Sequence, residues 1–183
     1  TTFDLLCGLL FLLESNLNIF TSLTENFYVN QEYENFLLNK KGLKIKNDDF
    51  LNFEIIWDNC IIFYPSTFEK IINNFKKSDK RFFVIPIAIL LPKGAHSNIL
   101  IYDREINESE RFEPNGSQYP FKYNYNPHKL DLILSNKFKQ IFEDSNYITP
   151  FDFLPKISFQ VYELNDYDYM MYIGDPGGFC AAW

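Results

Sequence analysis

Residues 93–116, KGAHSNILIYDREINESERFEPNG, decide how the C-terminal half of the chain can fold. Two apolar runs, SNILIYD and ERFE, are separated by the polar residues REINES, and this pattern predicts a β-hairpin. The hairpin carries His96, one of the 2 histidines in the chain, near its start and Glu113 near its end. A histidine and a carboxylate are therefore expected on neighbouring strands.

The spacing of His96 and Glu113 allows them to meet. If the turn is centred between Arg104 and Glu105, the two residues face each other directly, and their Cβ atoms are about 5 Å apart. A carboxylate in that position accepts the imidazole N–H, fixes the tautomer and stabilises the imidazolium. The alternative is that His96 only ends a strand and that Glu113 is a solvated carboxylate at the sheet edge.

A third candidate, Cys180, follows the residues DPGGF near the end of the chain. The Asp-Pro-Gly-Gly run predicts a tight turn, and Cys180 is then expected in the first turn of a buried helix. The positive end of a helix dipole favours a thiolate, and the free amides there can hold an oxyanion. Gly177 and Gly178 allow a substrate backbone to approach closely. The alternative is a structural Gly-Gly turn beside a buried cysteine.

Apolar periodicity predicts the helices elsewhere in the chain. They are expected over residues 3–15, 24–39 and about 67–77, with a fourth after Asn126. Ser66 and Glu69 match a capping box for the third helix. Asn126 is expected to cap the fourth, with Pro127 in its first turn.

Two further apolar stretches predict strands. FEIIWDNCIIFYP is broken at Asp58-Asn59 and fits two short strands around a turn. In the segment 81–91, the run FFVIPIAILL that follows Arg81 is continuously apolar, as expected of a central strand. Pro86 lies within that run and cannot donate to a ladder, so a bulge or an edge contact is expected there.

Composition excludes several classes of function. The net charge of −7 argues against nucleic acid as a partner. The apolar run 5–13 is too short to span a bilayer, so no membrane is expected. No Cys/His cluster has zinc spacing and no glycine-rich phosphate loop is present, so neither a metal nor a cofactor is expected. His128, at the start of the fourth helix, is interpreted as a plain surface residue.

The cysteines and the amino-acid composition indicate the environment and the kind of organism in which the protein is made. Cys7, Cys60 and Cys180 cannot form a closed disulfide framework, which fits a reducing environment inside a cell or a virion. Cys7 and Cys60 are expected to be small buried hydrophobes. Abundant Asn, Ile, Lys, Phe and Tyr are typical of an AT-rich coding sequence, such as that of a large DNA virus, a protist or a low-GC bacterium.

The C-terminal half of the chain, from about residue 81, resembles cysteine proteases of the adenovirus-protease and SUMO-protease type. AHSNILIYD and RFEPNG are similar to the histidine and acid segments of that family, and DPGGFC supplies a cysteine at a helix start. The resemblance implies that His96 is the general base, Glu113 its orienting acid and Cys180 the nucleophile. The implied reaction is hydrolysis of a peptide or isopeptide bond in a protein or peptide substrate, with viral or host proteins as further partners.

The same resemblance implies an α+β, papain-like fold in circularly permuted order. A central, mainly antiparallel sheet is expected to pack against the nucleophile helix, with the N-terminal helices as an added layer. Residues 1–78 are expected to be a helical accessory region. Residues 79–183 are expected to be the protease-like core, incomplete at its C-terminal end.

The sequence departs from the family pattern at two places. Ser97 follows the histidine where the family has Trp, and Asp175 lies where a Gln for the oxyanion hole is sought. Gln160 is the nearest replacement, if the intervening loop folds out. These departures favour an alternative, a catalytically weak or inactive protease-like structural or interaction protein of a large virus particle, as a minor capsid or internal component. A third possibility is a plain α+β binding domain.

Overall fold

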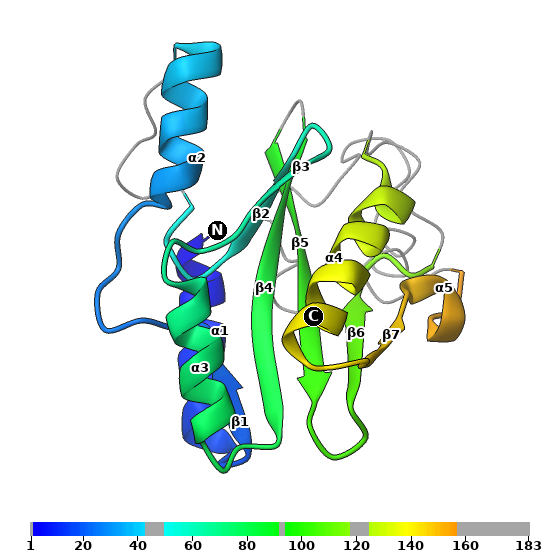
Figure 1. Cartoon of the computed structure of the whole chain (residues 1–183). Coiled ribbons are helices and arrows are strands. Elements are labelled where there is room, and N and C mark those ends of the chain that lie inside the picture. The colour runs from blue at the N-terminus through cyan, green and yellow to red at the C-terminus, as the bar shows by residue number, and fades with distance from the viewer. Residues whose placement is uncertain (1, 43–49, 92–93, 118–124, 157–183) are drawn as a thin grey trace, which may run out of the picture.

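The computed structural model describes residues 2–42, 50–91, 94–117 and 125–156. Its centre is a seven-stranded sheet in the order β3-β2-β4-β5-β6-β7, with β1 pairing to β4 outside this path (Figure 1). The strands are β1 (Ile19–Thr21), β2 (Ile55–Asp58), β3 (Ile61–Phe63), β4 (Phe82–Leu91), β5 (Gly94–Asp103), β6 (Glu108–Phe112) and β7 (Asn146–Ile148). The helices are α1 (Thr2–Ser15), α2 (Gln31–Phe36), α3 (Phe68–Lys77), α4 (Pro127–Ile141) and α5 (Pro150–Phe153), and α2 continues as the π-helix η1 (Leu37–Lys41).

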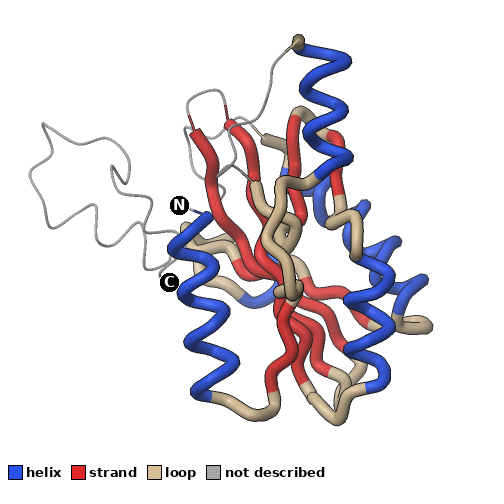
Figure 2. The backbone as a smooth tube through the Cα atoms, turned by 90° about the vertical axis from the view of Figure 1, so that its left-hand side faces the viewer, coloured by secondary structure: helices blue, strands red, loops and turns tan. Residues whose placement is uncertain are grey.

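Strand β4 is central because its alternating side chains feed two cores. Phe83, Ile85, Ile87 and Ile89 point to one face and pack against α3 and α4. Val84 points to the other face and packs against Leu5 and Leu9 of α1. The sheet is thus covered by α3 and α4 on one side and by α1 on the other (Figure 2).

Two strands share one edge of β4. β1 pairs in parallel with Phe82–Val84, and β2 pairs in parallel with Ile87–Ile89. Pro86 falls in the gap between them, where no partner strand needs its missing N–H. On the opposite edge Pro86 pairs with Ile99 in continuous register, so the expected edge contact is found and the bulge is not.

The sheet mixes both strand directions and crosses the boundary predicted at residue 78. β4, β5 and β6 form an antiparallel meander, and β2 and β3 are antiparallel as well. The pairs β1–β4, β2–β4 and β6–β7 are parallel. Strands β1, β2 and β3 all come from the region predicted to be a helical accessory layer.

Several predicted helices are present with changed ends. The helix predicted over residues 24–39 begins only at Gln31, because the Asn30 side chain accepts the Tyr33 amide at 3.1 Å and caps it there. The expected caps of α4 are confirmed, since Asn126 accepts the Lys129 amide at 2.9 Å and Pro127 occupies the first turn.

The capping box predicted at Ser66 and Glu69 is wrong. The N-cap residue of α3 is Thr67, which forms no side-chain cap. Asn52 bonds instead to the backbone of Ser66 and to the side chain of Thr67. Its side-chain oxygen accepts the Ser66 amide at 2.8 Å, and its Nδ2 donates to the Thr67 hydroxyl at 3.1 Å. Among the described residues, no helix is long and apolar enough to cross a membrane.

Candidate functional site

Two predicted site residues, His96 and Glu113, are in direct contact on the side of the sheet that α4 covers. Nε2 of His96 lies 2.6 Å from Oε1 of Glu113. The side chains are 0% and 2% exposed, so water does not compete for this contact. Because an ionised carboxylate only accepts, the Nε2–H of His96 is the donor of this hydrogen bond.

The strand register that brings the pair together differs from the predicted one. Asp103 pairs with Glu108 across a four-residue turn, so the turn is centred one residue later than expected. Asn107 supports this longer turn with a φ of 50°, in the left-handed region that Asn tolerates. The register shifts by two residues, and because strand side chains alternate with a period of two, both groups keep the same face. Glu113 is therefore diagonal to His96 rather than opposite to it.

The Glu113 carboxylate is held at both oxygens. Oε1 also accepts the backbone amide and the side-chain Nδ2 of Asn115, at 3.0 and 3.1 Å. Oε2 accepts Nδ2 of Asn98 at 2.9 Å and the hydroxyl of Tyr125 at 2.8 Å. Such a set of donors fixes the carboxylate rotamer, and the carboxylate in turn fixes the ring of His96.

The environment of Glu113 keeps it ionised. Burial opposes ionisation, but the charge and hydrogen bond of His96 outweigh it, together with the Asn115 amide and the charge of Arg111. These effects lower the pKa of Glu113 from 4.5 to about 2. Buried carboxylates that accept several N–H groups behave in this way.

Behind the pair, the network continues to Arg111 and Asp131. Arg111, which is 1% exposed, donates from Nε and Nη2 to the two Asp131 oxygens at 2.7 and 2.8 Å. Its third nitrogen donates to Oδ1 of Asn98. The Tyr147 hydroxyl donates to Asp131 at 2.9 Å. Burial opposes protonation of Arg111, but the hydrogen bond and charge of Asp131 reverse this and raise its pKa.

Sequence reasoning missed these supporting residues, although a signal for them exists. Arg111 and Glu113 are two residues apart on one strand and therefore share a face, which predicts that Arg111 is buried beside the acid. Asp131 directly follows Leu130 and lies within the apolar face of α4. A charged residue is almost never buried unless it is paired, so the two positions together predict an ion pair.

The two carboxylates of this network outnumber its one guanidinium. Glu113 and Asp131 carry two negative charges, and Arg111 carries one positive charge. Hydrogen bonds therefore supply part of the stabilisation of the buried carboxylates, and His96 makes one of those bonds.

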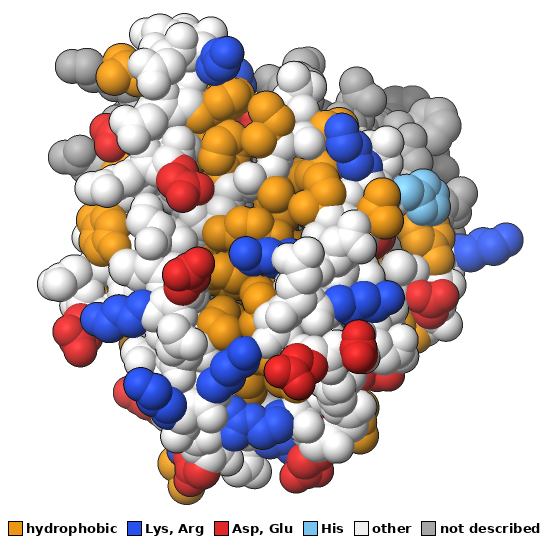
Figure 3. Space-filling view, in the orientation of Figure 1, with side chains coloured by type: hydrophobic (Ala, Val, Ile, Leu, Met, Phe, Trp, Pro, Cys, Tyr) orange, Lys and Arg blue, Asp and Glu red, His pale blue; other side chains and the backbone are white. Residues whose placement is uncertain are grey.

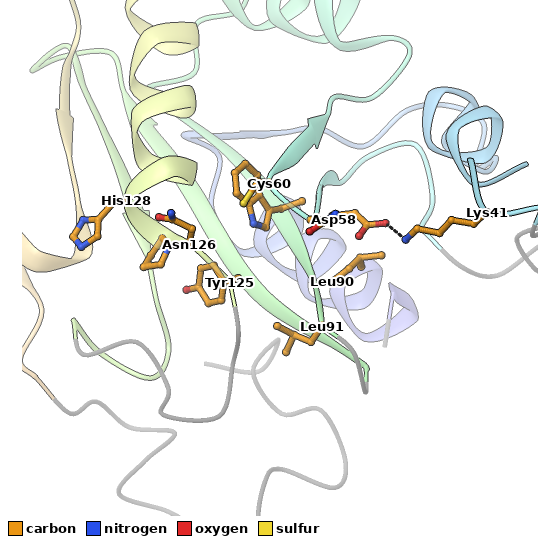
Figure 4. A pocket seen from close by; sticks show the side chains of 11 residues that line it. Lys41, Asp58, Cys60, Leu90, Leu91, Tyr125, Asn126 and His128 are labelled. Atoms are coloured by element: carbon orange, nitrogen blue, oxygen red, sulfur yellow. Dashed lines mark hydrogen bonds and ion pairs between the residues drawn. The ribbon is translucent and has the colours of Figure 1, made fainter. Parts of the chain in front are cut away.

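A cleft of about 830 Å³ opens beside this network. The start of α4, the β2–β3 hairpin and the end of β4 form its walls (Figure 4). Its lining residues include Trp57, Asp58, Cys60, Leu90, Leu91, Tyr125, Asn126 and His128. Tyr125 belongs to both features, because it lines the cleft and donates to Glu113.

The far wall of the cleft carries an ion pair. Nζ of Lys41 lies 2.7 Å from Oδ2 of Asp58, and the Tyr33 hydroxyl donates to the same oxygen at 3.0 Å (Figure 4). Asp58 precedes the tight turn Asn59-Cys60, in which both residues have positive φ angles of 50° and 66°. The ion pair thus ties η1 to the tip of the β2–β3 hairpin.

Other predicted residues have mixed outcomes. Cys180, Gly177, Gly178 and Gln160 lie outside the described residues, so their roles stay predictions. The burial predicted for Cys7 is wrong, because it is exposed on α1, and Cys60 is only partly buried at a hairpin tip. His128 is exposed and stacks on Phe151 with ring centroids 4.8 Å apart. Within the described part of the chain, no three His, Cys, Asp or Glu side chains form a metal site.

Comparison with known proteins gives one informative similarity. No family model matches the chain, and no solved structure matches it either. The chain is similar to an ankyrin repeat protein of Acanthamoeba polyphaga mimivirus. The two are 43% identical over 151 residues, which are 78% of this chain and 20% of the mimivirus protein. This chain therefore spans about a fifth of the length of its relative.

This similarity corrects the expectation of a cysteine protease. The mimivirus relative is named for its ankyrin repeats and not as a protease, so the predicted kinship with adenovirus-type and SUMO-type proteases is wrong. The predicted peptidase function is wrong with it, and so is the alternative of an inactive protease-like particle component. The short histidine and acid segments that suggested the protease family are weaker support than identity over most of the chain.

Proposed function

We propose that this chain is a protein-binding domain of a larger viral protein, and that it binds a polypeptide partner in the cleft beside Tyr125. Its mimivirus relative is named for ankyrin repeats, which form extended surfaces for protein recognition. An ankyrin repeat has about 33 residues, built as a turn and two helices. The seven-stranded sheet of this chain is a different unit, so the proposal assigns it to a globular domain beside such repeats.

The cleft is the observation that carries the proposal. Its volume of about 830 Å³ is within the range of ligand-binding pockets. Its lining combines apolar side chains such as Leu91 with polar ones such as Asn126. This combination is typical of binding sites, in which apolar groups supply affinity and a few polar groups fix orientation. Tyr125 is held by Glu113 and Asp58 by Lys41, so two walls are set before a partner arrives. Preorganised walls reduce the entropy lost on binding.

A polypeptide partner also fits the charge of the protein. The net charge of −7 disfavours nucleic acid. The proposed setting is inside a cell or a virion, and the free thiols of Cys7 and Cys60 support a reducing environment.

Overlapping peptides tiled across the mimivirus proteins test the proposal. Peptides that bind the wild-type chain are expected to lose binding to Leu91→Lys, which puts a charge into the cleft. They are expected to bind Leu132→Lys as well as wild type, because Leu132 is 61% exposed on α4 and does not line the cleft. Absence of any binding peptide, or equal binding by both variants, would overturn the proposal.

One observation favours catalysis of an acid–base step as a second candidate function. The His96–Glu113 pair has the arrangement of a base with an orienting carboxylate. His96 pairs with Ile89 across β4 and β5, next to the cleft residues Leu90 and Leu91. Neither side chain of the pair lines the cleft, but Tyr125 lines it and donates to Glu113, so this tyrosine links the buried pair to a cavity large enough for a reactant.

Hydrolysis of p-nitrophenyl acetate tests this second candidate. The wild-type rate is expected to exceed background, and His96→Gln is expected to abolish that excess. Glu110→Gln, on the opposite face of β6, is the control and is expected to keep it. A wild-type rate at background, or an unchanged rate in His96→Gln, would rule this candidate out.

A further inference from the structure

A groove separate from the cleft runs between α3 and α4 on the outer face of the molecule. It consists of two adjoining hollows of about 290 and 310 Å³, which share Lys76 and Ile141 in their linings. Among the described residues, none that lines the cleft also lines these hollows. We name this feature the α3–α4 groove.

The floor of the α3–α4 groove is apolar. Phe68 and Ile72 of α3 lie on one side, and Ile141 and Phe142 lie on the other. Figure 3 shows hydrophobic side chains along the valley between these two helices, with lysine or arginine side chains beside them. An apolar valley bordered by charge is a feature of protein-binding surfaces.

Two lysines lie across this floor. Nζ of Lys137 is 5.3 Å from the ring centroid of Tyr64 and 6.0 Å from that of Phe68. Nζ of Lys76 is 5.7 Å from the ring centroid of Phe142. In the described part of the chain neither ammonium group has a carboxylate within ion-pair distance, in contrast to Lys41 with Asp58. Both are therefore available to an incoming carboxylate.

The two helices are basic in an acidic protein. α3 and α4 together contain six lysines, Lys70, Lys76, Lys77, Lys129, Lys137 and Lys139, against the carboxylates of Glu69 and Asp131. Their net charge is thus +4, whereas the whole chain carries −7. Since Asp131 is buried with Arg111, the outward-facing charge of these helices is still more positive. In the lining of the groove itself, Lys76, Arg104 and Lys137 outnumber Glu69 and Glu143. Charge complementarity therefore selects an acidic partner.

We propose that the α3–α4 groove binds an acidic amphipathic helix of another protein. The apolar side chains of that helix would pack on the partly buried Ile141 and on the outer edges of Phe68, Ile72 and Phe142, which are 5–7% exposed. Its carboxylates would pair with Lys76 and Lys137. Amphipathic helices dock into apolar grooves in this way, with anchors three and four residues apart. The site extends the proposed protein-binding function to a second surface and does not depend on the cleft.

Three synthetic peptides of equal length test the proposal by fluorescence polarisation. The first is an amphipathic helix with Glu on its polar face and Leu and Phe on its apolar face. The second replaces each Glu by Lys, and the third replaces the apolar residues by Ser. The first peptide is expected to bind about tenfold or more tightly than either of the others, and its binding should weaken as salt is added.

Charge reversal locates the binding. The double variant Lys76→Glu/Lys137→Glu is expected to bind the acidic peptide about tenfold less tightly than wild type. The matched control Lys70→Glu/Lys139→Glu has the same charge change on the same helices, outside the lining of the groove, and is expected to lose much less. Equal loss in both double variants, or equal affinity for the lysine peptide, would overturn the proposal.

Chemical-shift mapping uses the wild-type chain, so its result does not depend on whether a variant folds. Addition of the acidic peptide is expected to shift the amides of Ile72, Lys76 and Ile141. Shifts confined to Leu91, Tyr125 and His128 would place the peptide in the cleft instead. That result would overturn the groove while leaving the cleft proposal intact, so failures of the two proposals are distinguishable.

Discussion

His96 and Glu113 form a hydrogen-bonded pair of 2.6 Å although the β5–β6 ladder does not set them opposite each other. Their contact is diagonal, and Asn115 completes it by donating to the same carboxylate oxygen. The pair is thus a product of the whole buried network and not of the hairpin alone. Changes at its other members should therefore be felt at His96.

Neutralising Glu113 should be costly. Glu113→Gln removes the charge that faces His96 and Arg111 and leaves donors without an acceptor, which typically costs about 3–5 kcal/mol in a buried pair. The free energy of unfolding, measured by urea titration, checks this. Glu110→Gln makes the same chemical change on the other face of β6 and should cost far less. Similar losses in the two variants would contradict the network.

Arg111 and Asp131 should be strongly coupled. A double-mutant cycle with Arg111→Met and Asp131→Leu is expected to give an interaction energy of about 0.5–3 kcal/mol, because either single variant leaves one charge buried and unpaired. The double variant should lose less unfolding free energy than the sum of the losses in the two single variants. Strict additivity of the unfolding free energies would show that the pair contributes nothing.

Acid should destabilise the protein through Glu113. The folded-state pKa of Glu113 is lowered to about 2 from 4.5, so its contribution is fully present above pH 4.5 and is lost as the pH falls toward 2. His96→Gln removes the neighbouring charge that lowers the pKa of Glu113 most, and should move this loss to higher pH. An acid-unfolding curve with the same midpoint in both proteins would be the contrary result.

Glu54 should act in the opposite direction. It is 1% exposed, and burial raises its pKa from 4.5 to about 7 against the hydrogen bonds of the Thr2 side chain and the Leu51 backbone. The folded state therefore holds the proton more tightly, and stability should fall as the pH rises from 4.5 to 7. Glu54→Gln should reduce the change of the melting temperature with pH over that range. Glu69→Gln, at an exposed position, should leave the slope unchanged.

The β2–β3 turn carries strain that glycine should release. Cys60 has a φ of 66° at the second turn position, where a type I′ turn prefers Gly after Asn. Cys60→Gly is expected to raise the unfolding free energy by up to about 1 kcal/mol. Cys60→Ala, which removes the thiol but keeps the Cβ, should not raise it. A gain of equal size in the alanine variant would assign the effect to the thiol and not to the backbone.

Much of the fold was predictable because its elements follow local rules. Helix α1, the strand pair around Asp58-Asn59 and the central strand β4 are all present where apolar patterns predict them. The gap between β1 and β2 along β4 at Pro86 also follows from local chemistry, because proline has no N–H to donate to a partner strand. What local rules could not supply were contacts between distant segments, such as β1 with β4. The predicted capping box at Ser66 was wrong for the same reason, because Asn52, which is distant in the sequence, bonds to Ser66 and Thr67.

The candidate site was predictable only in part. The pairing of His96 with Glu113 follows from two strands and a turn, although Asn107 extends that turn and changes the register. Arg111 is positioned by Asp131, which lies on α4, and no local pattern fixes how α4 packs against β6. The resemblance to proteases relied on short segments, in which a few matching residues can occur without common ancestry.

The divided edge of β4 has a consequence for truncated versions of the protein. β1 covers only Phe82–Val84, so removal of the first 21 residues would bare three residues of a long apolar strand. An uncovered strand of this kind recruits other chains by edge-to-edge pairing. Shortened forms that begin after β1 are therefore expected to aggregate, even though the main ladder between β4 and β5 remains complete.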